Sequence, residues 1–400
     1  MDINKAFKFR FYPNKEQKED LARTFGCARK VYNDSLEIRK NAYQEHKQSV
    51  SYNELSFLLT LRKAREEYGY LNEVSSVVLT QSLRDLDKAY INFFKHKTGY
   101  PKLKSKMEEQ SVRYAGNSFK YDRARSLTLA KMSGPLKIRW DRTIPKAAAE
   151  RVTSVTLSKD RADRYFVSFT TIDAVAYKPV INSNVGLDLG LHDFVTLSTG
   201  EKVAHPRFYR KAEARIITLQ KRLSRKQKGS KNREKARLKF AKAHARVKDM
   251  RKDFLHKLSS KLINENQVIC VEDLAVCNMS RNRRLAKSIM DSGWGVFVRQ
   301  LTYKASWYGR SVVKVGRFFP SSKTCSHCGT IKPQLSLSER RWTCPDCGTE
   351  HDRDVNAALN VLAEGISVLA CGEVSSGVGA VRRNVKLTSV KQEISLYSKS

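Results

Sequence analysis

Residues 184–191 are Asn-Val-Gly-Leu-Asp-Leu-Gly-Leu, a short apolar stretch that contains one carboxylate, Asp188. Val185, Leu187 and Leu189 fall at every second position, which is the spacing of a half-buried strand. A carboxylate at the edge of a buried element must pair with a cation or bind a metal ion. The stretch therefore predicts a strand that carries Asp188 at the edge of a buried element.

Two further acids stand in comparable places. Glu272 directly follows the apolar run 268–271, which suits a buried strand, and Asp354 lies where a helix is about to begin. Three carboxylates on two strands and a helix start make an oxygen-rich site that suits Mg²⁺ or Mn²⁺. Two such ions about 4 Å apart can activate a water and stabilise the leaving oxygen of a phosphodiester. We therefore interpret Asp188, Glu272 and Asp354 as candidate metal-binding and catalytic residues.

Other readings of these acids remain open from the residues alone. A single acid at a strand end is commonly a salt-bridge partner, and Asp354 could be no more than an N-cap. Asp193, Asp273 and Asp352 are competing carboxylates. Neighbouring side chains on a strand face opposite ways, so Glu272 and Asp273 cannot both face the site, and the same reasoning sets Asp352 against Asp354.

Four of the eight cysteines form two C-x-x-C pairs, Cys325 with Cys328 and Cys344 with Cys347, and 15 residues separate the pairs. Thiolates at this spacing favour one closed, structural Zn²⁺ site without an open position for water. His327 lies inside the first pair and is an alternative ligand, although four thiolates already complete the shell.

The charge of the chain points to a polyanionic partner. Its 400 residues carry 76 Lys and Arg against 40 Asp and Glu, a net charge of +36. Residues 201–260 hold 21 basic and 5 acidic residues, and their apolar spacing predicts an antiparallel helix pair broken at 227–231. We expect this pair, including Arg222 and Lys228, to track phosphates; a merely solvated face is the alternative.

The rest of the chain predicts a β domain interrupted by helices. Phe7, Phe9 and Phe11 alternate with basic residues in a predicted strand, helical spacing fills 15–97, and a hairpin is expected around 158–163. No apolar run reaches the roughly 20 residues of a membrane span, and no signal-peptide core is visible at the start. We expect a cytoplasmic protein without membrane contact.

Seven motifs along the chain form a recognisable series: GLDLGL at 186–191, VEDL at 271–274, FPSSKTCSHCG at 319–329, CPDCGTEHDRDVNAALN at 344–360, YPNKEQKEDLARTFGCARKVYN at 12–33, LRDLDKAYINFF at 83–94 and GYPKLKSK at 99–106. Together they resemble the motifs of the TnpB (OrfB) family, transposon-encoded RNA-guided nucleases similar to type V CRISPR effectors.

The resemblance implies an α/β multidomain fold: a RuvC-like RNase H domain with an inserted zinc ribbon, and an N-terminal β-barrel, the wedge, interrupted by a helical recognition domain. Its expected boundaries are 1–14 and 109–182 for the wedge, 15–108 for the recognition domain, 183–317 and 350–366 for the nuclease, 318–349 for the ribbon, which would bind target nucleic acid, and 367–400 for a basic, disordered tail.

It also implies roles. Asp188, Glu272 and Asp354 match the family's metal-binding acids, which hold two Mg²⁺, with Mn²⁺ as the alternative ion. The partners would be a transposon-derived guide RNA and double-stranded DNA that is cut beside a short adjacent motif, with the chain acting as a monomer on its RNA near the prokaryotic nucleoid. Candidate residues for reading the adjacent motif are Tyr52, Ser75, Ser76, Gln81 and Asn117.

Two other functions fit parts of the same pattern. A zinc-ribbon DNA-binding regulator without catalysis explains the charge and the cysteines but leaves the three acids unexplained. A transposase that joins DNA strands itself also uses an acidic triad, and it needs transposon ends rather than a guide RNA.

Overall fold

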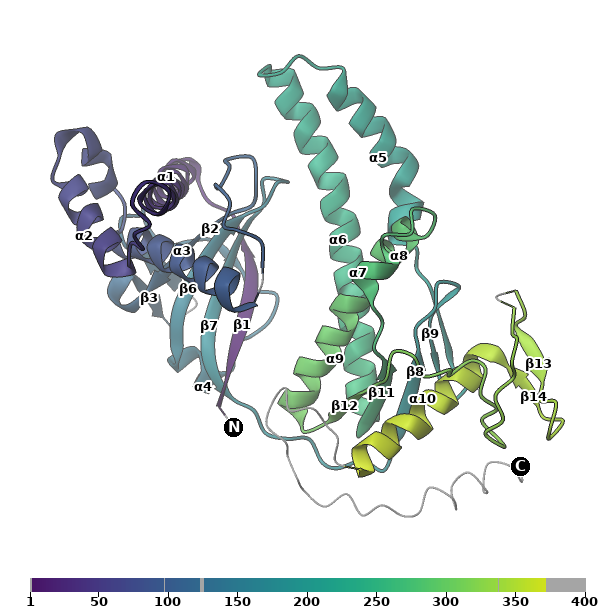
Figure 1. Ribbon diagram of the computed structural model, residues 1–400. Helices are drawn as coiled ribbons and strands as arrows, with labels where there is room; N and C mark the ends of the chain where they lie inside the picture. The colour runs from purple at the N-terminus through teal and green to yellow at the C-terminus, as the bar shows by residue number, and fades with distance from the viewer. Residues whose placement is uncertain (1, 97, 123–125, 337, 372–400) are drawn as a thin grey trace. The chain divides into compact units, whose positions relative to one another are not determined.

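The computed structural model describes residues 2–96, 98–122, 126–336 and 338–371. The chain divides into two compact units, each discontinuous in sequence. Unit 1 comprises Met1–Ala176 and Arg210–Met250, and unit 2 comprises Tyr177–Tyr209 and Arg251–Ser400. Each unit is described by itself below (Figure 1).

Unit 1 contains an antiparallel sheet in the order β2-β6-β7-β1-β5 and a separate hairpin, β3-β4. Phe7, Phe9 and Phe11 of β1 are buried, which confirms the predicted strand, and β6 and β7 form the predicted hairpin. The described strands do not show closure into one barrel. The strands are β1 Asp2–Phe11, β2 Gln110–Ala115, β3 Phe119–Asp122, β4 Ser126–Leu129, β5 Ile138–Arg139, β6 Val152–Lys159 and β7 Tyr165–Ala174.

The helices of unit 1 build a second core beside the sheet. Leu79, Leu83 and Leu86 of α3 are fully buried against α1 and α2, as their spacing predicts. A capping box between Asn14 and Gln17 begins α1 directly after Pro13. The helices are α1 Lys15–His46, α2 Tyr52–Lys63, η1 Glu66–Asn72, α3 Ser76–His96, η2 Gly116–Ser118 and α4 Lys146–Glu150.

The predicted basic helix pair is present as α5 Phe208–Ser224 and α6 Lys231–Glu265. Gly229 has a φ of +84° in the connection, a conformation that glycine adopts without strain. Arg233 Nη1 closes the turn by donating to the carbonyls of Leu223 at 3.1 Å and Lys226 at 2.8 Å.

Unit 2 is built on a five-stranded mixed sheet in the order β10-β9-β8-β11-β12. β11 is parallel to both β8 and β12, whereas β9 is antiparallel to β8 and to β10. The strands are β8 Asn184–Asp188, β9 Asp193–Leu197, β10 Lys202–Ala204, β11 Val268–Glu272 and β12 Ser311–Val315. The remaining elements are α7 Val276–Met279, α8 Ala286–Ser292, α9 Trp294–Tyr308, β13 Arg341–Thr343, β14 Glu350–Asp352 and α10 Arg353–Ala370.

Helices cover both faces of this sheet. Ile269 and Val271 of β11 pack with the end of α6 and with Phe297 of α9 on one face. Val268 and Cys270 point to the other face, where Val361 of α10 covers them. Burial on both faces explains why 268–271 is a continuous apolar run rather than an alternating one (Figure 1).

α10 approaches the sheet unusually closely because glycines stand at the contact. A Cβ on Gly186 of β8 would lie 2.1 Å from the carbonyl oxygen of Ala358 and 2.7 Å from the backbone nitrogen of Leu362. Gly365 of α10 likewise faces Cys270, whose Sγ would be 2.4 Å from an added Cβ. Only residues without a side chain allow this distance between helix and sheet.

The end of α10 differs from the expected boundary. The helix continues beyond 366 to Ala370, because Ile366, Val368 and Leu369 still pack on the β11–β12 side of the core. The remainder of the predicted tail, 372–400, lies outside the described residues.

We predict that Gly186→Ala lowers the free energy of unfolding by at least ~2 kcal/mol, since a backbone segment of α10 must move to admit the methyl group. Gly295→Ala is the matched control, because Gly295 is an exposed helical position with nothing within 4 Å of an added Cβ. It should leave stability unchanged or raise it by up to ~1 kcal/mol. Urea unfolding of both variants measures the contrast, and equal stabilities would contradict the close-packing argument.

Candidate functional site

The three candidate acids lie at one edge of the unit 2 sheet. Asp188 is the last residue of β8 and Glu272 the last of β11, and these parallel neighbours are in register, with Leu187 opposite Val271. Asp354 is in the first turn of α10, the helix that packs on Gly186. The carboxyl ends of parallel strands are where α/β sheets place ligand sites.

The three charges influence one another. The pKa of Asp188 is raised to about 8, first because the carboxyl is buried and then because Glu272 and Asp354 are negative; Arg353 and Arg340 oppose the shift. Like charges that share a buried site disfavour the ionised form of one of them. A divalent cation would remove that penalty, so the donor set fits Mg²⁺ or Mn²⁺.

Hydrogen bonds orient two of these carboxylates. Ser321 Oγ donates to Glu272 Oε1 at 2.6 Å. Arg340 Nη1 lies 3.3 and 3.4 Å from the two oxygens of Asp354. Within the described residues, the four cysteines are the one metal-ligand group that gathers within 4.8 Å, so the acids are close enough to interact but less tightly clustered.

The competing carboxylates have other partners. Asp352 is the N-cap of α10, accepting from the backbone nitrogens of Asp354 and Val355 at 3.1 Å, and it pairs with Lys202 at 2.7 Å. Asp273 pairs with Arg317 at 2.8 Å. Asp193 contacts the ring of His192. The largest contributions of neighbouring carboxylates to the raised pKa of Asp188 come from Glu272 and Asp354.

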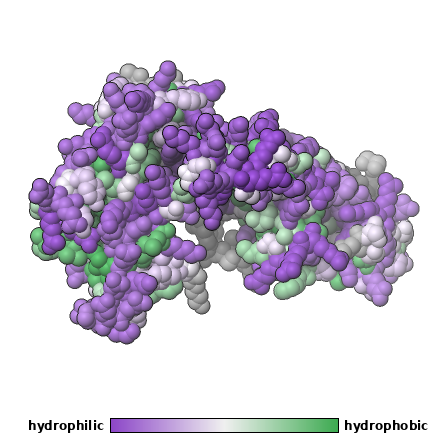
Figure 2. All heavy atoms as spheres, turned by 90° about the horizontal axis from the view of Figure 1, so that it is seen from above, coloured by the Kyte–Doolittle hydropathy of each residue, from purple (hydrophilic) through white to green (hydrophobic). Residues whose placement is uncertain are grey.

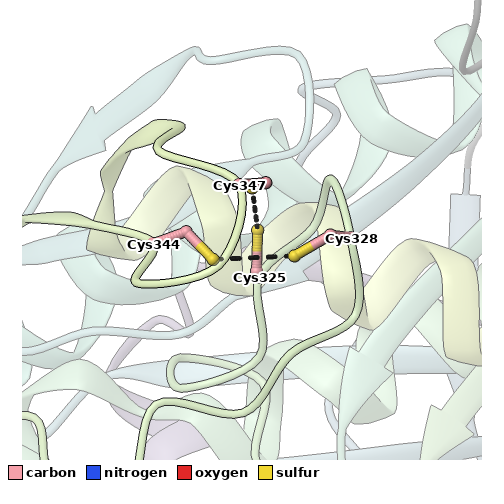
Figure 3. Close-up of side chains that lie close together, drawn as sticks. All are labelled: Cys325, Cys328, Cys344 and Cys347. Carbon is pink, nitrogen blue, oxygen red and sulfur yellow. Dashed lines mark hydrogen bonds between the residues drawn. The ribbon is translucent and has the colours of Figure 1, made fainter.

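The four cysteines converge on one point (Figure 3). Cys325 Sγ lies 3.7 Å from Cys347 Sγ, and Cys328 Sγ lies 3.5 Å from Cys344 Sγ. Tetrahedral zinc with Zn–S bonds of about 2.3 Å would separate its sulfurs by about 3.8 Å. The cluster is therefore consistent with a zinc site.

The two halves of the cluster are built alike, from the sequences Cys-Ser-His-Cys-Gly-Thr and Cys-Pro-Asp-Cys-Gly-Thr. In each, the first cysteine exchanges backbone hydrogen bonds with the turn, and the glycine has a positive φ, 82° at Gly329 and 69° at Gly348. The threonine after each glycine stabilises the second thiolate. Hydrogen bonds from Thr330 lower the pKa of Cys328 to about 6, and those from Thr349 lower the pKa of Cys347.

His351 is a neighbour of the cluster that the sequence analysis did not identify. Its Nε2 lies 3.0 Å from Cys325 Sγ and its ring packs on Trp342 at 4.7 Å. Burial lowers the pKa of His351, so the neutral ring can donate to the thiolate as an outer partner. His327, the alternative ligand, is exposed and lies outside the four-cysteine group.

The candidate nucleic-acid contacts are spread over unit 1. Ser76, Asn117, Arg222 and Lys228 are exposed, and Tyr52 is half-buried at the start of α2. Ser75 and Gln81 are buried, at 7% and 8% exposure. Most of the surface visible in Figure 2 belongs to hydrophilic residues, with hydrophobic side chains in scattered patches. The contacts of the candidate residues with nucleic acid stay predictions.

In the part of the chain that the structure describes, no helix combines the length and apolarity that crossing a membrane requires.

Family models and relatives agree on what the chain is similar to. Residues 166–283 match a family described as "Probable transposase" (OrfB), 294–361 match the "Cas12f1-like, TNB domain", and 1–48 match a "Helix-turn-helix domain". A Streptomyces pristinaespiralis protein named "Putative RNA-guided DNA endonuclease" is 48% identical over 394 residues, covering 98% of this chain and 96% of the relative. The chain belongs to the TnpB (OrfB) family.

A second relative of this TnpB-family chain is "Putative RNA-guided DNA endonuclease InsQ" of Escherichia coli, 33% identical over 390 residues, with 93% of this chain and 95% of that protein covered. Among solved structures, a Cas12f1–sgRNA–target DNA complex matches with a TM-score of 0.56 at 14% identity, over 90% of this chain and 98% of the other. At that identity the match shows a shared mixed α/β multidomain fold.

The helix-turn-helix match covers a different structure here. The described residues 2–46 form one strand, β1, followed by one continuous helix, α1.

We predict that the purified chain contains one Zn²⁺ and that Cys347→Ser loses it, with protease sensitivity rising within 320–350, because a closed thiolate site contributes folding energy. Cys277→Ser is the control, since Cys277 is an exposed cysteine outside the cluster. Elemental analysis and limited proteolysis provide the readouts. Wild-type protein without zinc, or equal zinc in both variants, would contradict the assignment.

We also predict that Asp188→Asn stabilises the metal-free protein in a pH-dependent way. The folded-state pKa of about 8 lies above the unfolded value near 3.8, so the native state binds the extra proton and wild-type stability falls as pH rises between these values. The gain in melting temperature should be small near pH 4 and largest at pH 8 to 9, in Mg²⁺-free buffer.

Asp273→Asn is the matched control for that experiment, because it removes an ion-pair partner of Arg317 rather than a carboxylate whose ionised form is disfavoured. It should show no such gain. A pH-independent difference for Asp188→Asn would show that the carboxyl is ionised throughout.

Proposed function

We propose that this chain is an RNA-guided DNA endonuclease in which Asp188, Glu272 and Asp354 hold two Mg²⁺ ions, with Mn²⁺ as an alternative, and direct phosphodiester hydrolysis. One observation carries the proposal. The three acids come from two parallel strands and a helix, and they lie close enough together for Glu272 and Asp354 to raise the pKa of Asp188. The names of the relatives support the reaction class.

The ions would supply an activated water and would stabilise the leaving oxygen. The protein itself positions the three acids. β8 and β11 hold Asp188 and Glu272 side by side, and Gly186 lets α10 bring Asp354 to the same edge. Arg340, which pairs with Asp354, would have to share that carboxylate with a bound cation.

The domain assignment is part of this proposal. Residues 183–317 and 350–366 would form the RuvC-like nuclease, and the mixed sheet with acids at its carboxyl edge supports this. The cysteine cluster, within 318–349, would bind one structural Zn²⁺ in a ribbon that contacts target nucleic acid. Residues 1–14 with 109–182 would form the wedge, and 15–108 the recognition domain.

The partners would be a transposon-derived guide RNA and double-stranded DNA, bound by the chain as a monomer on its RNA. A net charge of +36 and the exposed cations of α5 and α6, such as Arg222, support polyanion binding. The exposed residues Ser76 and Asn117 remain candidates for reading the adjacent motif.

We expect Asp188→Ala, Glu272→Ala and Asp354→Ala each to reduce cleavage of a matched plasmid by more than about 100-fold, since even the outer partners of metal ligands are worth about 10- to 100-fold. Binding of guide RNA and target should stay near wild type, because the basic surface and base pairing provide it. The assay uses Mg²⁺, the RNA that co-purifies with the chain, and a parallel binding measurement.

Asp273→Ala and Asp352→Ala are the controls and should keep appreciable activity. Asp352→Ala should lose the ~1 kcal/mol of a helix cap and the ion pair with Lys202, which at this exposure is worth at most ~1 kcal/mol. If Asp354→Ala still cuts DNA and Asp352→Ala does not, the third metal ligand is Asp352 rather than Asp354. Full activity in all three acid variants would reject the proposal. Joining of transposon ends without RNA would favour a transposase, and specific DNA binding without cleavage would favour a regulator.

A further inference from the structure

The turn Ser321–Ser326 connects the two candidate metal sites of unit 2. It contains Cys325, a member of the cysteine cluster. At its other end, Ser321 is 7% exposed, and its hydroxyl donates to Glu272 Oε1 at 2.6 Å. Within the described residues Oε2 of Glu272 has no hydrogen-bond partner, so the serine fixes the carboxylate and leaves one oxygen for another ligand.

Two buried asparagines of α10 hold this turn. Asn360 Nδ2 donates to the carbonyls of Ser321 at 2.8 Å and Thr324 at 2.6 Å. Asn356 Nδ2 donates to Thr324 O at 2.7 Å, and Asn356 Oδ1 accepts from Ser326 N at 2.9 Å. They are 6% and 1% exposed, so unpaired amides or carbonyls here would be costly.

The same helix carries the third acid. Asp354 stands two residues before Asn356, in the first turn of α10. The thiolate cluster, the turn, Glu272 and the start of α10 are thus joined by one set of short hydrogen bonds that are at least partly buried. A displacement of the turn would shift both Glu272 and Asp354.

We propose that Ser321, Asn356 and Asn360 are positioning residues that couple the cysteine cluster to the acidic site, so that the closed thiolate site fixes Glu272 and Asp354 in the orientation that binds a divalent cation. The inference rests on the proposed function in treating these acids as metal ligands. Hydrogen bonds of this kind to metal-ligating carboxylates typically contribute about 10- to 100-fold in metal affinity or activity.

The test is Mn²⁺ binding to the full, zinc-loaded chain without nucleic acid, followed by electron paramagnetic resonance. Ser321→Ala should weaken Mn²⁺ binding about tenfold while zinc content and melting temperature stay at wild-type values. Ser326→Ala is the matched control: it lies in the same turn, and its hydroxyl makes no hydrogen bond within the described residues. It should bind Mn²⁺ as wild type does.

Asn360→Ala provides a second variant, since it removes the hydrogen bonds from α10 to the Ser321 and Thr324 carbonyls without touching either metal site. It should also weaken Mn²⁺ binding, and the Mg²⁺ concentration that gives half-maximal cleavage should rise in both Ser321→Ala and Asn360→Ala. Wild-type Mn²⁺ affinity in Ser321→Ala overturns the inference, as does equal weakening in Ser326→Ala.

The outcomes separate this inference from the proposed function. A wild-type chain that binds Mn²⁺ more tightly than Ser321→Ala, yet cuts no guided target, supports the coupling and rejects the nuclease proposal. Guided cleavage that is equal in wild type and Ser321→Ala, with equal Mn²⁺ affinity, supports the nuclease and rejects the coupling.

Discussion

The contact between α10 and the sheet at Gly186 is the constraint on which unit 2 depends. A methyl group at that position would overlap the Ala358 carbonyl at 2.1 Å, so the helix lies as near the strand as backbones allow. This one distance brings the first turn of α10, with Asp354, to the edge where β8 and β11 end in acids. It also sets where Asn356 and Asn360 meet the cysteine-bearing turn.

Bringing three carboxylates together opposes folding, and the structure offsets that cost only in part. Burial and the neighbouring charges keep the Asp188 carboxyl protonated near neutral pH, with its pKa near 8. Arg340 partly neutralises Asp354, and the Ser321 hydroxyl satisfies one oxygen of Glu272. What remains is a concentration of negative charge that the proposed divalent cation would offset, which is the usual compromise between stability and activity.

The sequence predicted much of this fold because its signals are local. Three patterns each lie within a single element and indicate which of its residues are buried: the alternation of Phe7, Phe9 and Phe11, the α3 leucines, and the apolar run 268–271. The two C-x-x-C pairs likewise predicted the cysteine cluster. Position alone showed only that one acid of each neighbouring pair can face the site, and the resemblance to the family's motifs selected Asp188, Glu272 and Asp354 over Asp273 and Asp352. Their catalytic role stays a prediction.

The features that sequence reasoning missed depend on packing between distant segments. Gly186 lies in the GLDLGL motif, yet only the position of α10 shows that a residue with a side chain would not fit there. His351 beside Cys325 and Ser321 beside Glu272 are pairs separated by 26 and 49 residues, and no local spacing indicates them. The Asn-Ala-Ala-Leu-Asn run offered a signal, because polar residues four apart on a buried helix face need partners.

The duplicated cysteine turn has a chemical consequence of its own. Cys325 and Cys344 are buried, whereas Cys328 and Cys347 are exposed and are the thiols whose pKa is lowered. Before metal is bound, the exposed pair is therefore the nucleophilic one, and each of its sulfurs lies within 3.7 Å of a buried sulfur from the opposite turn. Oxidation of these thiols would remove the ligands that zinc requires, so an oxidising environment and metal loading compete for the same four atoms.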